Sequence, residues 1–216
     1  TAGFIDIHTH VYHGETAIGI DPDKVGVELG VTSVIDAGTS GADTFEDFYN
    51  RIIKNSKTKV FAFLNIASLG LKTLNELNDM SNIDFEKIKK IVEKYKGTIV
   101  GIKARASASV VGENGIAPIK KAKEIAKELG IPIMVHIGNA PPKVEEVLNL
   151  LEKGDIVTHC YHNKENNLVK DIGMLEEALE AKKRGVLFDI GHGNSSFSFD
   201  IGKKAIKDGF SPDFLS

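Results

Sequence analysis

The sequence contains a single cysteine, Cys160, and this scarcity limits how the chain can be stabilised. One cysteine excludes a disulfide within the chain and is typical of a reducing compartment, so we expect a cytoplasmic protein. Stability must then come from a hydrophobic core. With 216 residues, 42% of them hydrophobic, the chain is long enough to bury a substantial one.

Long apolar runs and a strong charge of either sign are also missing. No apolar stretch approaches the roughly 20 residues that cross a bilayer, and no signal-peptide pattern opens the chain. The net charge is -3, so neither nucleic acid nor a membrane is an expected partner. We expect a small-molecule substrate, and the composition leaves open whether the protein forms a homo-oligomer.

Short β-branched runs alternate with amphipathic stretches along the whole chain. This alternation predicts strands at Phe4–His8, Thr32–Asp36, Lys59–Ile66, Ile99–Lys103, Ile131–His136, Ile156–His159 and Val186–Ile190. The intervening helices are predicted at Pro22–Leu29, Thr44–Asn55, Phe85–Tyr95, Ile116–Leu129, Lys143–Leu151, Gly173–Arg184 and Phe199–Lys207. No linker or repeat interrupts the series, so residues 1–216 are predicted to form one domain.

Regular alternation of strand and helix is compatible with an open doubly wound sheet or with a closed barrel. An open sheet of this kind is expected to carry a glycine-rich phosphate loop after its first strand, whereas this chain has His8-Thr9-His10 there. Residues 212–216 resemble the start of an eighth strand, on which the chain stops. The predicted fold is therefore an α/β (β/α)8 TIM barrel, truncated before or within strand 8.

The first strand ends in two histidines one residue apart, His8 and His10. Side chains at positions i and i+2 of a strand point to the same face, so both imidazoles can bind one metal ion. Asp6 shares their parity and could orient one ring. The alternative is a polar strand end whose histidines only meet solvent.

Later strands also end in side chains that can act as ligands. Lys103 closes strand 4, His136 closes strand 5 and His159 closes strand 6. Each alone has an ordinary explanation, because single histidines are often structural and single lysines often extend to the surface. Together with the first two histidines they make five such residues at the active end of four barrel strands, which favours a shared site.

At these residues the chain resembles the amidohydrolase superfamily, in its dihydroorotase-like and deacetylase-like branch. The resemblance lies in HTH at His8, "GIKARAS" at Lys103, "VHIGNAP" at His136, "THCYH" at His159 and "FDIGHGNSSFSF" around His192. It implies two divalent metals, commonly zinc, bridged by a hydroxide and by a lysine carboxylated with carbon dioxide. By the same resemblance, His8 and His10 would hold the more buried metal, His136 and His159 the other, and carboxylated Lys103 would lie between them.

The chain departs from the family pattern at its end. The pattern has an aspartate at the end of strand 8, which binds the first metal and transfers protons, and we expect this residue beyond Ser216. Asp213 could be proposed as a substitute for that aspartate, but it lies at the start of the strand, the wrong end of the barrel. The family's small β-sandwich domain is not visible either, so the 216 residues resemble the barrel core of a longer enzyme.

Three further residues are candidates for binding substrate. Arg105 has the parity of Lys103 and could bind a substrate carboxylate, although a surface salt bridge is an equal alternative. His192 follows strand 7 between two glycines and could bind substrate or orient a ligand. His162 follows His159 on a loop and could contact substrate.

The resemblance implies a metal-dependent hydrolase that cleaves an amide or ester bond with a metal-bridging hydroxide, for instance one that deacetylates a small acylated compound. A cyclic amidohydrolase of the dihydroorotase or hydantoinase type is the alternative within enzymes. From another class, a catalytically silent barrel with a binding role stays open.

Overall fold

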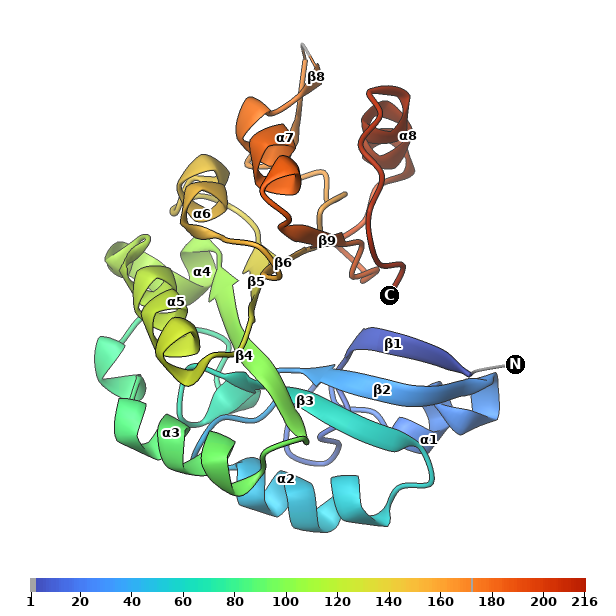
Figure 1. Cartoon of the computed structure of the whole chain (residues 1–216), viewed down its shortest axis with the longest axis vertical. Helices are drawn as coiled ribbons and strands as arrows, with labels where there is room; N and C mark the ends of the chain where they lie inside the picture. The colour runs from blue at the N-terminus through green and yellow to red at the C-terminus, as the bar shows by residue number, and fades with distance from the viewer. Residues whose placement is uncertain (1–2, 172) are drawn as a thin grey trace.

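The computed structural model describes residues 3–171 and 173–216, and its centre is a strongly curled parallel sheet (Figure 1). Seven strands follow one another in the order β1-β2-β3-β4-β5-β6-β9, and all neighbours are parallel. Their bounds are β1 Phe4–Thr9, β2 Val31–Ala37, β3 Lys59–Asn65, β4 Ile99–Ala106, β5 Ile133–Ile137, β6 Ile156–Thr158 and β9 Leu187–Asp189.

Helices connect the strands and pack on the outer face of the sheet (Figure 1). They are α1 Pro22–Val25, α2 Phe45–Arg51, α3 Phe85–Lys94, α4 Ala108–Val111, α5 Ala117–Leu129, α6 Val144–Leu150, α7 Glu176–Lys183 and α8 Phe199–Lys207. Single 3-10 turns are η1 Val27–Leu29, η2 Ile53–Asn55, η3 Gly70–Lys72, η4 Met80–Asn82 and η5 Gly112–Asn114. Within the described ranges, no helix combines the length and apolarity needed to cross a membrane.

The last residues of the chain begin an eighth strand beside β9, as the sequence predicts. Phe214 forms a parallel bridge with Asp189, and the Ile190 amide donates to the Phe214 carbonyl at 3.1 Å. Asp213 holds the start of this segment, because its carboxylate accepts from the Phe188 amide at 2.8 Å and from Lys182 Nζ at 3.1 Å. The topology is that of a (β/α)8 barrel with seven strands and the beginning of the eighth.

Besides the helix predicted at 44–55, which divides at Ile52 into α2 and η2, two predicted helices are shorter than expected. The helix predicted at 22–29 breaks at Gly26, whose backbone is not helical, and divides into α1 and η1. The helix predicted from residue 173 begins only at Glu176, because β8 (Gly173–Met174) pairs with β7 (Val169–Lys170) in a small antiparallel hairpin. Tertiary contacts override helix propensity in both segments.

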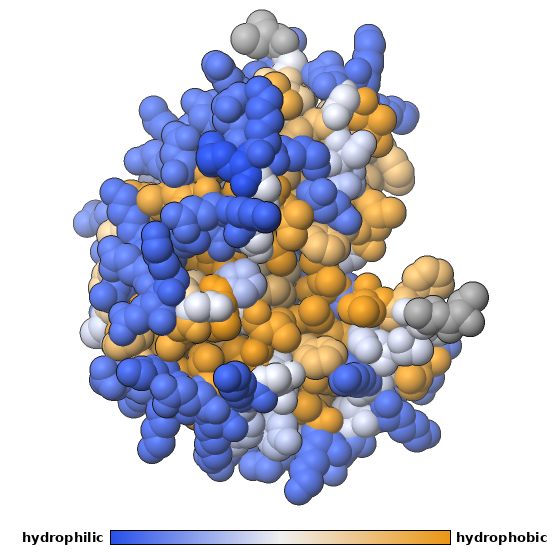
Figure 2. Space-filling view, viewed as in Figure 1, coloured by the Kyte–Doolittle hydropathy of each residue, from blue (hydrophilic) through white to orange (hydrophobic). Residues whose placement is uncertain are grey.

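The core has an outer and an inner part. The larger outer part lies between the sheet and its helices, and it includes Ile102 and Ala104 of β4. The inner part is a small cluster inside the curl, made by Ala37, Phe63, Met134 and Ile156. Figure 2 shows hydrophobic side chains lining this hollow. Because β4 alternates between the two faces, Lys103 and Arg105 belong to the inner side.

A β-bulge interrupts the pairing of β1 with β2. Asp6 pairs with Val34 and Thr9 pairs with Asp36, so three steps along β1 correspond to two along β2. A bulge of this kind re-aims the side chains that follow it. Ile7 consequently packs against the inner cluster while His8, the next residue, still lines the cavity described below.

Candidate active site

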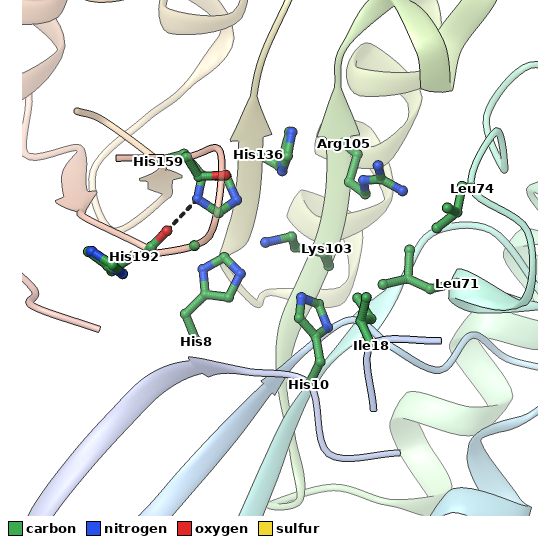
Figure 3. Close-up of a pocket in the computed structure, with 13 residues that line it drawn as sticks. His8, His10, Ile18, Leu71, Leu74, Lys103, Arg105, His136, His159 and His192 are labelled. Atoms are coloured by element: carbon green, nitrogen blue, oxygen red, sulfur yellow. Dashed lines mark hydrogen bonds between the residues drawn. The ribbon is translucent and has the colours of Figure 1, made fainter. Parts of the chain in front are cut away.

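A cavity of about 350 Å³ lies where the strands end, at the carboxyl side of the sheet. Parallel barrels place their active sites at this end. Figure 3 shows four histidines and Lys103 converging on this cavity from β1, β4, β5 and the segment after β6. Its lining comprises His8, His10, Ile18, Leu71, Leu74, Lys103, Arg105, His136, His159, Gly191, His192, Gly193 and Ser196.

The four imidazole rings form a continuous row. The ring centres of His10 and His8 are 5.6 Å apart, those of His8 and His159 are 4.9 Å apart, and those of His159 and His136 are 4.5 Å apart. The structure therefore brings together the four histidines that the sequence selects, although they come from segments far apart in the chain.

The rings of His8 and His10 are each held through Nδ1 by a threonine hydroxyl. His8 Nδ1 lies 2.7 Å from Thr158 Oγ1, and His10 Nδ1 lies 2.8 Å from Thr39 Oγ1. His8 Nδ1 is also 3.2 Å from the Asp189 carboxylate. In both rings Nε2 is the nitrogen left for a ligand.

His159 is held in a different way. Its backbone has φ +68, the left-handed region, and no other non-glycine residue in the described ranges has a positive φ. Its Nδ1 donates to the Gly191 carbonyl at 2.7 Å (Figure 3). Gly191 must be glycine at this approach, since a Cβ there would lie 2.7 Å from that same Nδ1. A glycine placed after β9 thus supports a histidine placed after β6.

Burial keeps all four histidines neutral. Loss of hydration lowers the pKa of His10 and His159 to about 3, and the nearby Lys103 ammonium lowers both pKa values further. The pKa values of His8 and His136 lie well below the ordinary value, first because of burial. Neutral imidazoles offer the lone pairs that metal ions require.

Lys103 carries an amine that is almost fully buried, with 2% of the residue exposed. Its Nζ lies 3.2 Å from the sulfur of Met134, and in the described part of the chain it forms no salt bridge with a carboxylate. Burial lowers the pKa of Lys103 to about 7, and the attraction of the Asp189 carboxylate offsets this effect only in part. A large share of this lysine is therefore a neutral, nucleophilic amine at neutral pH.

Arg105 points into the same cavity and is anchored from behind by Glu76. Arg105 Nη1 lies 3.2 and 3.1 Å from the two carboxylate oxygens of Glu76, a residue that is 2% exposed. The guanidinium keeps further N–H donors for a ligand. Next to it, Ile18, Leu71 and Leu74 form an apolar wall (Figure 3).

The other sequence candidates lie in different places. His192 lines the cavity, with its ring 4.8 Å from that of Phe197. His162 is fully buried outside the cavity lining, where its Nδ1 accepts from the Lys164 amide at 3.1 Å, so the structure does not bring it to the substrate side. Asp213 lies beside Phe188 of β9, whose amide donates to its carboxylate, and it is not among the residues that line the cavity.

The structure places Asp6 differently from the prediction. Its carboxylate accepts from the His8 backbone amide at 2.9 Å and does not touch either ring. The bulge in β1 breaks the parity on which that prediction depended. Asp36 and Asp189 instead stand behind the two rings, each through a threonine hydroxyl.

The donor set, four neutral histidines around a buried lysine amine, suits divalent metal ions. No three His, Cys, Asp or Glu side chains lie close enough to hold one ion, in residues 3–171 and 173–216. The histidines instead lie as two pairs, His8 with His10 and His136 with His159, around Lys103. Three of the rings have Nδ1 engaged with protein groups, which leaves Nε2 for a metal.

Comparison with known proteins supports what the fold and the site indicate. The Amidohydrolase family profile matches residues 1–208, and the chain belongs to this family of TIM-barrel hydrolases. A relative from Enterococcus faecalis named deacetylase is 43% identical over 212 residues, which cover 97% of this chain and 57% of that protein. The chain thus spans little more than half of this relative.

Two solved structures are similar over nearly the whole chain. One, described as an adenine deaminase, has a TM-score of 0.97 at 42% identity and covers 100% of this chain and 59% of its own. Another, described as a dihydroorotase, has a TM-score of 0.93 at 40% identity and covers 99% of this chain and 57% of its own. These likenesses confirm the predicted barrel fold and superfamily.

Three residues around the site were not predicted from the sequence. Asp36 and Asp189 occupy strands and could have been found by the same strand-end rule that selects the histidines. Glu76 lies in a loop between η3 and η4, where no periodic pattern marks it. Its pairing with Arg105, 29 residues away, depends on the tertiary fold.

Gly38 provides the first testable consequence of this packing. Its φ is +82, and an added Cβ would lie 2.5 Å from Cβ and Cγ of Lys103. We expect Gly38→Ala to lower the free energy of unfolding by about 2–3 kcal/mol, the sum of left-handed strain and overpacking. Urea denaturation measures this loss.

Gly30→Ala is the matched control, because Gly30 has φ +81 but no atom within 4 Å of an added Cβ. It should lose only about 1 kcal/mol from backbone strain. Equal losses of unfolding free energy in the two variants would show that Lys103 does not restrict the space at Gly38.

Proposed function

We propose that the protein of which this chain is part is a metal-dependent hydrolase that cleaves an amide or ester bond and removes an acyl group, such as acetyl, from a small compound. The observation that carries the proposal is the buried amine of Lys103, which has no carboxylate partner among the described residues and lies among four neutral histidines. The relatives named deacetylase support the type of bond.

The role proposed for Lys103 follows from its surroundings. A protonated lysine would repel two divalent ions, whereas a neutral amine can attack carbon dioxide, lose one proton and become an anionic carbamate. The two carbamate oxygens could each face one histidine pair, His8 with His10 and His136 with His159. Two bound ions, most simply Zn²⁺, would lower the pKa of water and polarise the substrate carbonyl.

The remaining lining defines where a substrate would lie. Arg105 offers a cationic donor held in place by Glu76, and it suits a carboxylate on the substrate. Ile18, Leu71 and Leu74 suit an apolar group beside that carboxylate. His192, on the opposite side of the cavity (Figure 3), and Ser196, which also lines it, can donate hydrogen bonds to the acyl portion. A cavity of about 350 Å³ has the size expected for a small molecule.

A cyclic amidohydrolase is the second candidate, supported by the 40% identity to a structure described as a dihydroorotase. The two activities share a reaction type, so the fold does not separate them. Turnover of acylated acids compared with that of cyclic amides by the natural full-length protein decides between them. If the protein turns over neither class of substrate, the binding role of a catalytically silent barrel is the interpretation that remains.

We predict two divalent ions per chain in protein purified without chelators. The physical reason is the pair of histidine pairs on either side of Lys103. Elemental analysis of the full-length protein, before and after growth with added zinc, measures the stoichiometry. A value near zero after supplementation with zinc and bicarbonate would contradict the proposed function.

We predict that Lys103→Ala loses activity by at least about 10²-fold and binds less metal, because the proposed bridge is gone. Short carboxylic acids such as formate should restore part of the activity by supplying two oxygens in the vacated space. Lys121→Ala is the control, since Lys121 lies exposed on α5 at the outer surface. Wild-type activity in Lys103→Ala would contradict the carbamate.

We predict that Arg105→Lys raises KM about 10-fold for acylated substrates that bear a carboxylate, with a smaller change in kcat. Lysine keeps the charge that Glu76 requires but loses the planar fork that binds a carboxylate with two hydrogen bonds. The methyl ester of the same substrate is the control and should respond little. Equal effects on the acid and the ester would assign Arg105 to structure alone.

A further inference from the structure

The two histidines of β1 are linked to buried aspartates by two similar chains of hydrogen bonds. His10 Nδ1 lies 2.8 Å from Thr39 Oγ1, which donates to Asp36 Oδ2 at 2.7 Å. His8 Nδ1 lies 2.7 Å from Thr158 Oγ1, which donates to Asp189 Oδ2 at 2.7 Å. We call these two chains the hydroxyl bridges.

The direction of each hydrogen bond can be deduced from the aspartate end. Asp36 also accepts from the backbone amides of Val11 and Thr39, at 2.8 and 2.7 Å, so it acts as an acceptor throughout. The single hydroxyl proton of Thr39 is therefore directed at Asp36. Its oxygen must accept from His10, which places a proton on Nδ1 and leaves a lone pair on Nε2.

The same reasoning applies to the second bridge. Asp189 accepts from Thr158 through Oδ2 and from Ser216 Oγ through Oδ1, at 2.7 and 2.6 Å, and it is fully buried. The Thr158 hydroxyl proton is directed at Asp189, so its oxygen accepts from His8 Nδ1–H. The direct approach of His8 Nδ1 to Asp189, at 3.2 Å, favours the same protonated nitrogen.

We propose that two positioning pairs fix the β1 histidines as Nδ1–H tautomers before any metal binds. Thr39 with Asp36 fixes His10, and Thr158 with Asp189 fixes His8. This inference relies on the proposed metal function only for its purpose, because the tautomers are a property of the protein alone. Groups that orient a ligand histidine in this way typically strengthen metal binding about 10–100-fold.

The two bridges differ in how much of the fold they require. Thr39 and Asp36 belong to β2 and the loop after it, directly beside β1. Thr158 and Asp189 belong to β6 and β9, which lie at the other end of the sheet order from β1. The bridge from His8 therefore spans the barrel interior and joins its first and last strands.

The first experiment determines histidine tautomers by ¹⁵N NMR in the metal-free full-length protein. We expect His8 and His10 to carry the proton on Nδ1 in the wild type. Thr39→Val should return His10 to a mixture of tautomers and leave His8 unchanged, whereas Thr39→Ser should keep the wild-type tautomer. A proton on Nε2 of His10 in the wild type would overturn the proposal, whatever the variants do.

The second experiment measures zinc affinity by competition with a chromogenic chelator. Thr39→Val should weaken one of the two sites about 10–100-fold, and Thr39→Ser should stay within a few-fold of the wild type. Thr9→Val is the matched control, because Thr9 donates to the Ile35 carbonyl at 3.1 Å and touches neither ring. Unchanged affinity and tautomer in Thr39→Val would overturn the proposal.

The pair Thr158→Val and Thr158→Ser repeats both measurements on His8, so a folding defect in one valine variant leaves the other arm decisive. A wild-type protein that binds no zinc but shows both Nδ1–H tautomers would contradict the proposed function and uphold the bridges. Zinc binding with the opposite tautomers would do the reverse.

Discussion

An amine is buried in the middle of this barrel, and the arrangement around it follows from that constraint. Lys103 leaves β4 on the inner face, between the inner cluster and the cavity, with the sulfur of Met134 as its nearest polar contact. Gly38 has no side chain at the point where Cβ and Cγ of Lys103 pass. Desolvation of a charged amine is costly, so the amine is driven toward its neutral, reactive form. That form is the one that the proposed carbamate requires.

The histidines around Lys103 are kept in place by groups from other strands. Each of three rings has Nδ1 tied to a threonine hydroxyl or a backbone carbonyl. Their partners come from the loop after β2, from β6 and from the turn after β9, so the site is assembled from both ends of the sheet. A cavity built this way depends on the curl of the whole barrel. His159 keeps a strained, left-handed backbone at the position where its ring donates to the Gly191 carbonyl, in the turn after β9.

The fold and the cavity residues define a reaction type more closely than a substrate. The chain is 40–43% identical to proteins with several names, deacetylase, dihydroorotase and adenine deaminase among them. These share a barrel and differ in what they are said to act on. In this chain the proposed substrate contacts are loop residues of the cavity together with Arg105 of β4, which Glu76 holds beside an apolar wall. Contacts of this kind can vary while the barrel stays the same.

Local sequence determined the order of the strands and most of the helices, because hydrophobic periodicity is a property of neighbouring residues. It also determined that His8, His10, His136 and His159 stand at or just beyond strand ends, where parallel strands converge. Lys103 was predicted to close its strand, but β4 continues to Ala106. The tertiary structure alone decided the bulge that turned Asp6 away, the hairpin that shortened α7, and the burial of His162 outside the cavity. It also decided the pairing of Arg105 with Glu76 and the hydroxyl bridges to Asp36 and Asp189. The physical reason is that most of these contacts join residues far apart in the chain, up to 181 positions for His8 and Asp189. Such contacts form only when strand register and sheet curvature bring their side chains within hydrogen-bonding distance.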